Sequence, residues 1–293
     1  MARNVISAKL DIIFKKFFTD NKDMLHSFVA GMLDIPQESI KEIQIRNSEL
    51  PPDDYDGKFS RLDLSLNVDG SLVNVEIQMK NDPDYRDRTL FYWAKLYSSE
   101  LKSGEDYSEL KQTITINIIN FNMFSGEDYH TEVAAMIKGT DEVFSDKFSI
   151  HFFELKKVNR KPDPNNNREL WLQFINADSE EEFEMLNQTN VPIMQKAVRI
   201  IYDMSEDTRI RELARIREKA MHDEASALKN AKAEGEAIGL EKGEAIGLEK
   251  GEAIGLEKGE AIGLEKGKAL IVSQMKAFGM TDEQINAILS GNS

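Results

Sequence analysis

Two acidic side chains stand at matching positions on either side of a predicted tight turn. Residues 61–80 read RLDLSLNVDGSLVNVEIQMK, in which apolar and polar residues alternate before and after Asp69-Gly70. An Asp-Gly pair between two such alternations is a strong signal for a two-residue β-hairpin turn of type I′. In the register that this turn sets, Val68 faces Ser71 and Asp63 faces Glu76.

The predicted hairpin has one apolar face and one polar face. Asp63 and Glu76 share the polar face, with Cβ atoms roughly 5 Å apart. Like charges at that separation destabilise a sheet unless a cation lies between them, and divalent ions favour such oxygen ligands. The alternative is a solvent-facing surface on which Arg61 neutralises the two acids. The residues alone leave both open. The apolar face pairs Leu62, Leu64 and Leu66 with Ile77, Val75 and Val73.

The elements that must position this hairpin follow from the spacing of apolar residues. They are a helix over 8–33, a strand over 40–45, the hairpin, a helix over 84–102, a buried strand over 112–121, and strands near 129–138 and 147–155. The order is α-β-β-β-α-β, and its strand-helix-strand step implies a right-handed crossover and a mixed sheet. We therefore predict an α/β fold whose sheet is mixed, as in α+β proteins.

The chain changes character after Pro162, where KPDPNNN reads as a linker. We divide it into a sheet core (1–160), a helical region (161–230), a repeat spacer (231–267) and a helical hairpin (268–293). The spacer holds four consecutive copies of GEAIGLEK. Eight residues advance a helix about 80° beyond two turns, so no single apolar stripe forms, and repeated glycines weaken an isolated helix. We expect a spacer whose length is not critical.

The terminal hairpin carries its own start and stop signals. Gly279 suits a helix C-cap, and Thr281 with Gln284 forms a capping box. Such a small unit cannot bury its apolar face alone. We expect it to dock on another copy of the chain, giving a homo-oligomer, or on the core.

Composition excludes several classes of function. The 293 residues include no cysteine, so neither a disulfide framework nor a thiolate metal site can form. A net charge of -15 argues against coating nucleic acid by general basicity. No apolar run is long enough for a membrane span and the start lacks a signal peptide, so we expect a cytoplasmic protein with no membrane partner. The four histidines lack zinc-ligand spacing, and GLEKGKA (263–269) falls short of a Walker loop, which excludes a nucleotide cofactor.

Longer stretches resemble a known family. The chain resembles the Rpn family of recombination-promoting nucleases and putative transposases, in the PD-(D/E)XK nuclease superfamily, over most of residues 8–230. The resemblance implies a restriction-endonuclease-like αβββαβ core with a helical C-terminal region and a repeat tail. It is carried by LDIIFKKFF, RLDLSL, VEIQMK, RTLFYWAKLYSSELKSGEDYSELKQTITINIINF, IHFFEL, NRELWLQFI and REKAMHDEASAL.

The resemblance also implies an activity: a DNA endonuclease that hydrolyses phosphodiester bonds with Mg²⁺ or another divalent cation, linked to recombination or transposition. Asp63 and Glu76 would hold the ion together with the backbone carbonyl of Ile77. Gln78 stands where the family has lysine, and it can orient water but cannot act as a cation. Lys80, two residues further on, faces the same way by strand parity and could supply that charge, or it is an ordinary solvated surface residue.

Four further residues are auxiliary candidates. Asp11 resembles an acidic position near the site in related nucleases, and an ordinary first-turn helix acid is the equal alternative. Arg88, Tyr92 and Lys95, at i, i+4 and i+7, could contact the phosphate backbone of DNA, or they are an amphipathic helix edge. Two rival functions stay open: a catalytically inactive DNA-binding protein, with Gln78 as the sign of decay, and an assembly or regulatory protein that depends on its tail.

Overall fold

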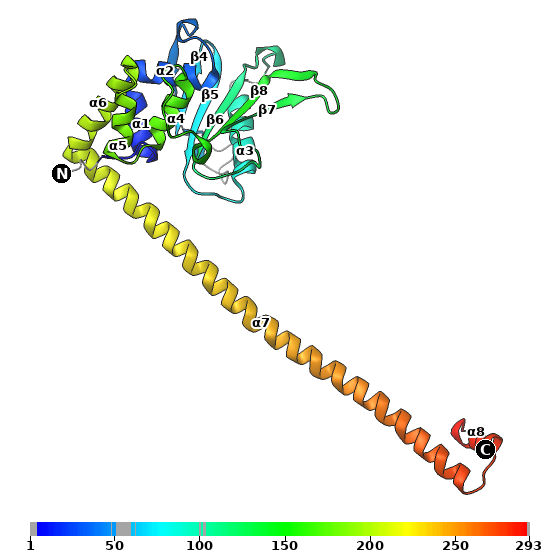
Figure 1. The fold of residues 1–293 in the computed structure, drawn as a ribbon. Coiled ribbons are helices and arrows are strands. Elements are labelled where there is room, and N and C mark those ends of the chain that lie inside the picture. The colour runs from blue at the N-terminus through cyan, green and yellow to red at the C-terminus, as the bar shows by residue number, and fades with distance from the viewer. Residues whose placement is uncertain are drawn as a thin grey trace. The chain divides into compact units, whose positions relative to one another are not determined.

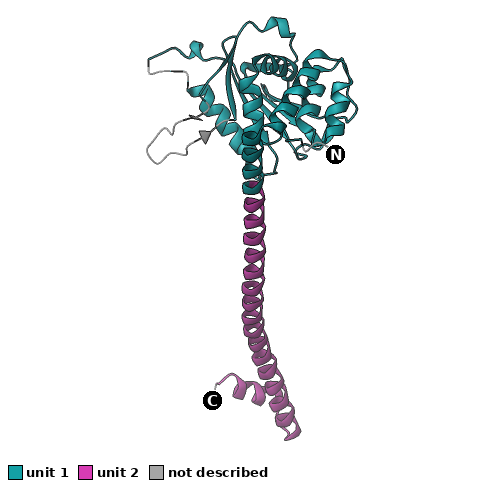
Figure 2. Ribbon diagram, turned by 90° about the vertical axis from the view of Figure 1, so that its left-hand side faces the viewer, with its two compact units in different colours: residues 1–220 teal, residues 221–293 magenta. Residues whose placement is uncertain are grey.

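The computed structural model describes residues 5–47, 49–50, 60–61, 63–99, 101 and 104–291. The chain divides into two compact units, residues 1–220 and residues 221–293, coloured separately in Figure 2. The first unit contains the sheet and its covering helices. The second contains the whole repeat and the terminal hairpin.

The helix predicted over 8–33 is two helices, α1 (Asp11–Asp20) and α2 (Lys22–Leu33). The chain leaves helical geometry at Asn21 (φ −128°, ψ 85°), whose side-chain amide donates to the Phe17 carbonyl at 2.8 Å. An asparagine that bonds to nearby backbone in this way competes with the helix, which is why one continuous helix was a wrong prediction. The predicted stop is confirmed, because Asp34 adopts a left-handed φ of 57°.

A mixed sheet of six strands forms the centre of the first unit (Figure 1). Its order is β1-β4-β5-β6-β8-β7, with parallel pairing of β5 to β6 and β6 to β8. The predicted α-β-β-β-α-β order and mixed sheet are therefore confirmed. The strands are β1 (Ile43–Ile45), β4 (Leu64–Val68), β5 (Ser71–Gln78), β6 (Thr113–Ile119), β7 (His130–Met136) and β8 (Val143–Glu154). The short 3₁₀ helices are Gln37–Ser39, Tyr107–Glu109 and Leu155–Lys157.

The β4–β5 hairpin has the predicted register. Asp69 (φ 49°) and Gly70 (φ 93°) both have positive φ, as a type I′ turn requires. The observed pairs run from Val68 with Ser71 to Leu64 with Val75. The first strand is shorter than predicted, because β4 begins at Leu64, and Arg61 instead pairs with Glu49 in a separate ladder of β2 (Glu49–Leu50) and β3 (Ser60–Arg61). Leu62 lies outside the described residues.

Helices cover both faces of the sheet. Helix α3 (Tyr85–Ser98) packs on the face that carries Asn74 and Asn117, where the Tyr85 hydroxyl donates to the Asn117 side chain at 3.0 Å. On the opposite face, the Arg168 guanidinium of α4 (Asn167–Asn176) lies 5.8 Å from the Phe153 ring centroid. The polar residues Ser65, Asn74 and Asn117 are buried. The alternative of a solvent-facing polar surface is therefore wrong for this part of the sheet.

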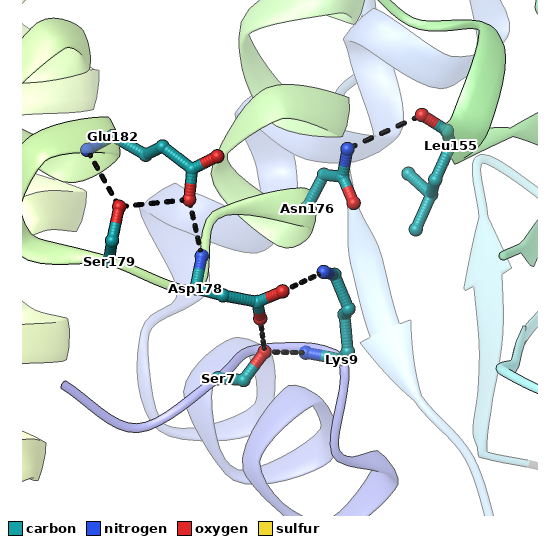
Figure 3. A network of polar contacts seen from close by, with 7 residues as sticks. All are labelled: Ser7, Lys9, Leu155, Asn176, Asp178, Ser179 and Glu182. Atoms are coloured by element: carbon teal, nitrogen blue, oxygen red, sulfur yellow. Dashed lines mark hydrogen bonds and ion pairs between the residues drawn. The ribbon is translucent and has the colours of Figure 1, made fainter. Parts of the chain in front are cut away.

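A polar network attaches the N-terminal segment to the helices after the linker (Figure 3). The Ser7 hydroxyl donates to Asp178 at 2.7 Å, and Lys9 forms an ion pair with the same carboxylate. The neighbouring Glu182 accepts hydrogen bonds from the Asp178 backbone and the Ser179 hydroxyl, at the start of α5 (Glu180–Asn187). The acidic run at 178–184 is therefore a helix N-terminus, where negative charge is favourable. Helix α6 (Pro192–Glu206) follows.

The repeat is helical. A single helix, α7 (Thr208–Ala277), begins in the first unit and includes every copy of the octad, and α8 (Asp282–Leu289) follows it. Gly279 has a φ of 84°, and the capping box of Thr281 with Gln284 is present, so both predicted hairpin signals are confirmed. No helix among the described residues combines the length and the apolar character needed to cross a bilayer.

The terminal hairpin leaves most of its apolar side chains exposed. Within the second unit, Ile285 is buried, whereas the Phe278 side chain is 88% exposed. This distribution agrees with a unit that needs a further surface to cover it. Leu270, Ile271, Ile288 and Leu289 are also exposed.

The first testable prediction concerns the tail. Removing everything after Leu228 should leave the melting temperature of the core within about 2 °C of the full-length value, since the sheet and its covering helices lie before that point. Light scattering should give more subunits per particle for the full-length protein than for the truncated protein, because we expect the exposed hairpin to dock on another copy. A variant lacking one octad but keeping the hairpin is the matched control, and it should keep the full-length number of subunits. The same number of subunits in the full-length and truncated proteins would contradict the docking role.

Candidate active site

Asp63 lies one residue before the first paired residue of β4. The last pair of the hairpin ladder joins Leu64 to Val75, so Asp63 does not pair with Glu76 through its backbone. Its side chain replaces the missing backbone partner, because the Ile77 N–H donates to Asp63 Oδ2 at 2.8 Å. The predicted proximity of Asp63 to Glu76 is thus kept by a side-chain hydrogen bond at the end of the hairpin.

Glu76 lies on the face of β5 that α3 covers. The Asn74 side-chain amide donates to Glu76 Oε1 at 3.1 Å, and Asn74 is buried. The parallel register sets Glu76 beside Asn117 of β6, which itself accepts from the buried Tyr85 of α3. The Glu76 carboxyl is therefore enclosed by polar groups of its own sheet and by the first turns of α3.

Burial and mutual repulsion disfavour the ionised forms of this pair. Burial raises the pKa of Asp63 to about 6, with a further increase from the charge of Asp11, while the Ile77 hydrogen bond, Lys15 and Arg217 act in the opposite direction. Burial and then the charge of Asp63 raise the pKa of Glu76 to about 8. Two carboxyl groups that resist ionisation beside each other are a site at which a bound cation gains affinity.

Gln78 connects the end of β5 to α3. Its side-chain amide nitrogen donates to the Lys80 carbonyl at 2.9 Å, and its oxygen accepts from Arg88 Nη2 at 2.9 Å. Arg88 also forms an ion pair with Asp82 at 3.2 Å, and its guanidinium lies 4.9 Å from the Tyr85 ring centroid. The cation fixed next to the glutamine is therefore Arg88.

Lys80 does not meet the geometric condition set from the sequence. Strand β5 ends at Gln78, so the alternation that would direct Lys80 to the same face as Glu76 does not extend to it. The Lys80 main-chain carbonyl, and not its strand position, is what links it to Gln78.

The rest of α3 divides between the site and the surface. Burial and then the charge of Glu76 raise the pKa of the Tyr92 hydroxyl, so Tyr92 lies within electrostatic reach of the carboxyl pair. Lys95 lies further along the helix, with Nζ 5.8 Å from the Phe91 ring centroid. Phe91 is 45% exposed, so this part of α3 lies at the surface. Arg88 and Tyr92 are thus close to the site, whereas Lys95 lies further along the helix, beside the exposed Phe91.

Asp11 lies in a cleft beside Asp63. The cleft has a volume of about 780 Å³ and is lined mainly by α1, together with Asp63 and Arg217 of α7. Arg217 holds Asp11 through two contacts of 2.8 Å, from Nε to Oδ1 and from Nη2 to Oδ2. The remaining lining residues are Ile12, Lys15, Lys16, Thr19 and Asp20.

The donor groups fit a hard divalent ion better than a zinc ion. Among the described residues, no three histidine or acidic side chains converge to hold a metal, so Asp11 does not complete a set with Asp63 and Glu76. Mg²⁺ needs no such set, because it is commonly held by one or two carboxylates, with water and substrate phosphate as the other ligands. The Asp63 and Glu76 carboxylates beside the Ile77 backbone fit that pattern.

The six-strand mixed sheet with its covering helices is a restriction-endonuclease-like core of the PD-(D/E)XK type. A family model described as PD-(D/E)XK nuclease family transposase matches residues 8–231, and the chain belongs to that family. The resemblance to Rpn-type nucleases and putative transposases is thereby confirmed, as is the restriction-endonuclease-like core. No curated protein and no solved structure gives a significant match.

Sequence reasoning missed two features near or beyond this site. Arg217 is separated from Asp11 by 206 positions, and no local spacing relates the two. The second is a histidine pair, in which His130 Nε2 lies 3.0 Å from His151 Nδ1, on neighbouring strands. Pairing β7 with β8 brings these histidines together, so only the strand register could have revealed it.

The second prediction concerns stability and pH. Both carboxyl pKa values are raised, so the folded protein without metal holds more protons than the unfolded chain between about pH 4 and pH 8, and the free energy of unfolding falls as pH rises through that range. Glu76→Gln should therefore gain stability over wild type as pH rises, by roughly 1–3 kcal/mol between about pH 5.5 and pH 8.5.

Urea unfolding in EDTA at both pH values measures this difference. Glu127→Gln is the matched control, because Glu127 is exposed and lies outside the strands that carry the carboxyl pair, so it should show no such gain. A Glu76→Gln advantage that stays constant from acid to alkaline pH would show that Glu76 is not destabilised in its charged form.

Proposed function

We propose that residues 8–231 form a divalent-metal-dependent endonuclease that hydrolyses phosphodiester bonds of DNA. The observation that supports this most strongly is the carboxylate pair at the end of the hairpin, with the Ile77 N–H bonded to Asp63 at 2.8 Å and Glu76 raised in pKa beside it. The raised pKa of Glu76 means that its ionised form destabilises the protein without metal, so the pair is better explained by binding than by folding. Membership of the nuclease family supports the same proposal.

In this proposal Asp63 and Glu76 hold Mg²⁺ or a similar ion, together with the Ile77 carbonyl. The ion supplies Lewis-acid polarisation of the phosphate and lowers the pKa of the attacking water. The protein orients these ligands: the Ile77 N–H fixes the Asp63 carboxylate and the Asn74 amide fixes that of Glu76. Both orienting groups belong to β5, so the orientation of the two carboxylates depends on that strand.

Gln78 and Arg88 take the place of the family lysine in this proposal. Gln78 is neutral, but its side-chain oxygen accepts from Arg88 at 2.9 Å, so a positive charge stands directly behind it. Arg88 is itself restrained by Asp82 and by the Tyr85 ring. We infer that Gln78 orients water or phosphate while Arg88 supplies the fixed charge that stabilises developing negative charge.

The third prediction tests catalysis directly. Asp63→Asn and Glu76→Gln should each reduce Mg²⁺-dependent nicking of supercoiled plasmid by at least about 100-fold, because each removes one charged ligand. Mg²⁺ titration by calorimetry should show weakened binding in the same variants. Circular dichroism verifies that they are folded.

Asp82→Asn is a control that preserves the carboxylate pair and should retain Mg²⁺ binding. Full cleavage by both site variants would overturn the site assignment. A different outcome is a wild-type protein that binds DNA but does not bind Mg²⁺ and does not cleave. That outcome would favour the inactive DNA-binding alternative, for which Gln78 is the sequence signal.

The fourth prediction concerns the glutamine. Gln78→Lys places a second cation next to Arg88 and removes the hydrogen bond between them, so we expect cleavage to fall by about tenfold and stability by roughly 1 kcal/mol. Adding Arg88→Ala should recover part of the cleavage, because the new lysine then stands alone. Lys80→Ala is the comparison, with a smaller expected loss. If Lys80→Ala is the most damaging of these changes, the positive charge comes from Lys80 and the Arg88 assignment fails.

A further inference from the structure

Arg217 makes the most direct contact between α7 and the acidic groups of the cleft. Its guanidinium binds both oxygens of Asp11 at 2.8 Å, in the parallel two-point geometry that also suits phosphate. Both side chains remain accessible, with 42% of Arg217 and 34% of Asp11 exposed. The pair therefore lies at the wall of the cleft and not inside the core.

The buried face of α7 determines where Arg217 points. Ile210 and Ala214 are buried, and Arg217 follows at the next position of the same helical face. These two apolar residues anchor the start of α7. A partly exposed ion pair adds little to that anchoring, so the role of Arg217 is better sought in the cleft.

The cleft offers further positive charge alongside Arg217. Lys15 and Lys16 lie on α1 in the same lining, and Lys16 binds Asp20 at 2.8 Å. Lys15 and Arg217 both act electrostatically on the Asp63 carboxyl. A DNA strand that reaches Asp63 through this cleft therefore passes three basic groups, of which Lys16 and Arg217 are paired with carboxylates.

We propose that Arg217 is a phosphate-binding residue of the active site, held on Asp11 until a divalent ion and DNA are bound and then transferred to the phosphate of the strand that is cut. This inference rests on the proposed nuclease function. The transfer exchanges one oxyanion partner of the guanidinium for another and needs no covalent change. The rest of α7 and its repeat play no part in it.

Charge explains why the exchange follows metal binding. A divalent ion between Asp63 and Glu76 places two positive charges close to Arg217, which repels the guanidinium and attracts Asp11. The DNA phosphate then offers the same two-oxygen geometry that Asp11 provided. Arg217 consequently opposes metal binding in the free protein and assists cleavage in the complex, two effects that a merely structural ion pair would not combine.

The test uses Arg217→Met and Arg217→Lys in the full-length chain, with Arg215→Met as the matched control. Arg215 lies on the same helix and binds both oxygens of Glu212, at 2.9 and 2.7 Å, but it does not line the cleft. Mg²⁺ affinity is measured by calorimetry without DNA at about pH 8.5, where the carboxyl pair is largely ionised. Plasmid nicking is measured at saturating Mg²⁺, and circular dichroism and melting temperature establish folding.

We expect Arg217→Met to bind Mg²⁺ about two- to tenfold more tightly and to cleave at least about tenfold more slowly than wild type. Arg217→Lys, which keeps the charge but loses the two-point contact, should bind Mg²⁺ like wild type and cleave at an intermediate rate. Arg215→Met should match wild type in both measurements.

The inference is overturned if folded Arg217→Met binds Mg²⁺ no more tightly than wild type, or cleaves at or above the wild-type rate. Should Arg217→Met fail to fold, wild-type cleavage by Arg217→Lys overturns it instead. A third outcome is that Asp63→Asn loses cleavage while Arg217→Met cleaves like wild type. That result would leave the nuclease proposal intact and remove only the arginine transfer. A wild-type chain that cuts no DNA removes both.

Discussion

The repulsion between Asp63 and Glu76 is the constraint around which the first unit is organised. Ionising both groups is unfavourable because burial raises both pKa values, and the charge of Asp63 raises that of Glu76 further. The surrounding structure nevertheless holds them together, through the Ile77 N–H on one and the Asn74 amide on the other. Natural proteins accept such local instability at functional sites and compensate for it elsewhere. Here the compensation is an aromatic core on α1, α2 and α4, in which Phe14, Phe17, Phe18, Phe28 and Trp171 are almost completely buried.

The covering of both sheet faces explains how the site acquires cations from distant parts of the chain. Helix α3 covers the Glu76 face and brings Arg88 to Gln78, whereas α1 and the start of α7 bring Lys15 and Arg217 to the cleft at Asp63. The strands contribute only acids and amides to the site. This division of cations to helices and acids to strands has a physical reason. A long arginine or lysine side chain can reach a sheet edge from a helix while its stem packs on apolar neighbours.

Local sequence was sufficient for the hairpin and insufficient for its surroundings. Asp69-Gly70 determined the turn and hence the register, which is why the proximity of Asp63 and Glu76 could be predicted. The later start of β4 could not be predicted from the sequence. Asp63 accepts a hydrogen bond through its side chain at the position where a backbone ladder pair was expected. The predicted direction of the Lys80 side chain failed for a related reason. Strand alternation applies only within a strand, and β5 ends at Gln78. Arg217 depends on packing between segments about 200 residues apart, which one sequence does not encode in any local pattern.

The distance between Asp11 and Arg217 along the chain also orders events during translation. The ribosome completes Asp11, Asp63 and Glu76 first, and Arg217 follows about 140 residues after Glu76. At about 5–20 residues per second, that interval is roughly 7 to 28 seconds. A nascent chain therefore holds both carboxylates well before it holds the guanidinium proposed to bind phosphate, and a product of premature termination before α7 never acquires it. Under the proposed role of Arg217, synthesis of the start of α7 is a condition for a complete phosphate-binding site.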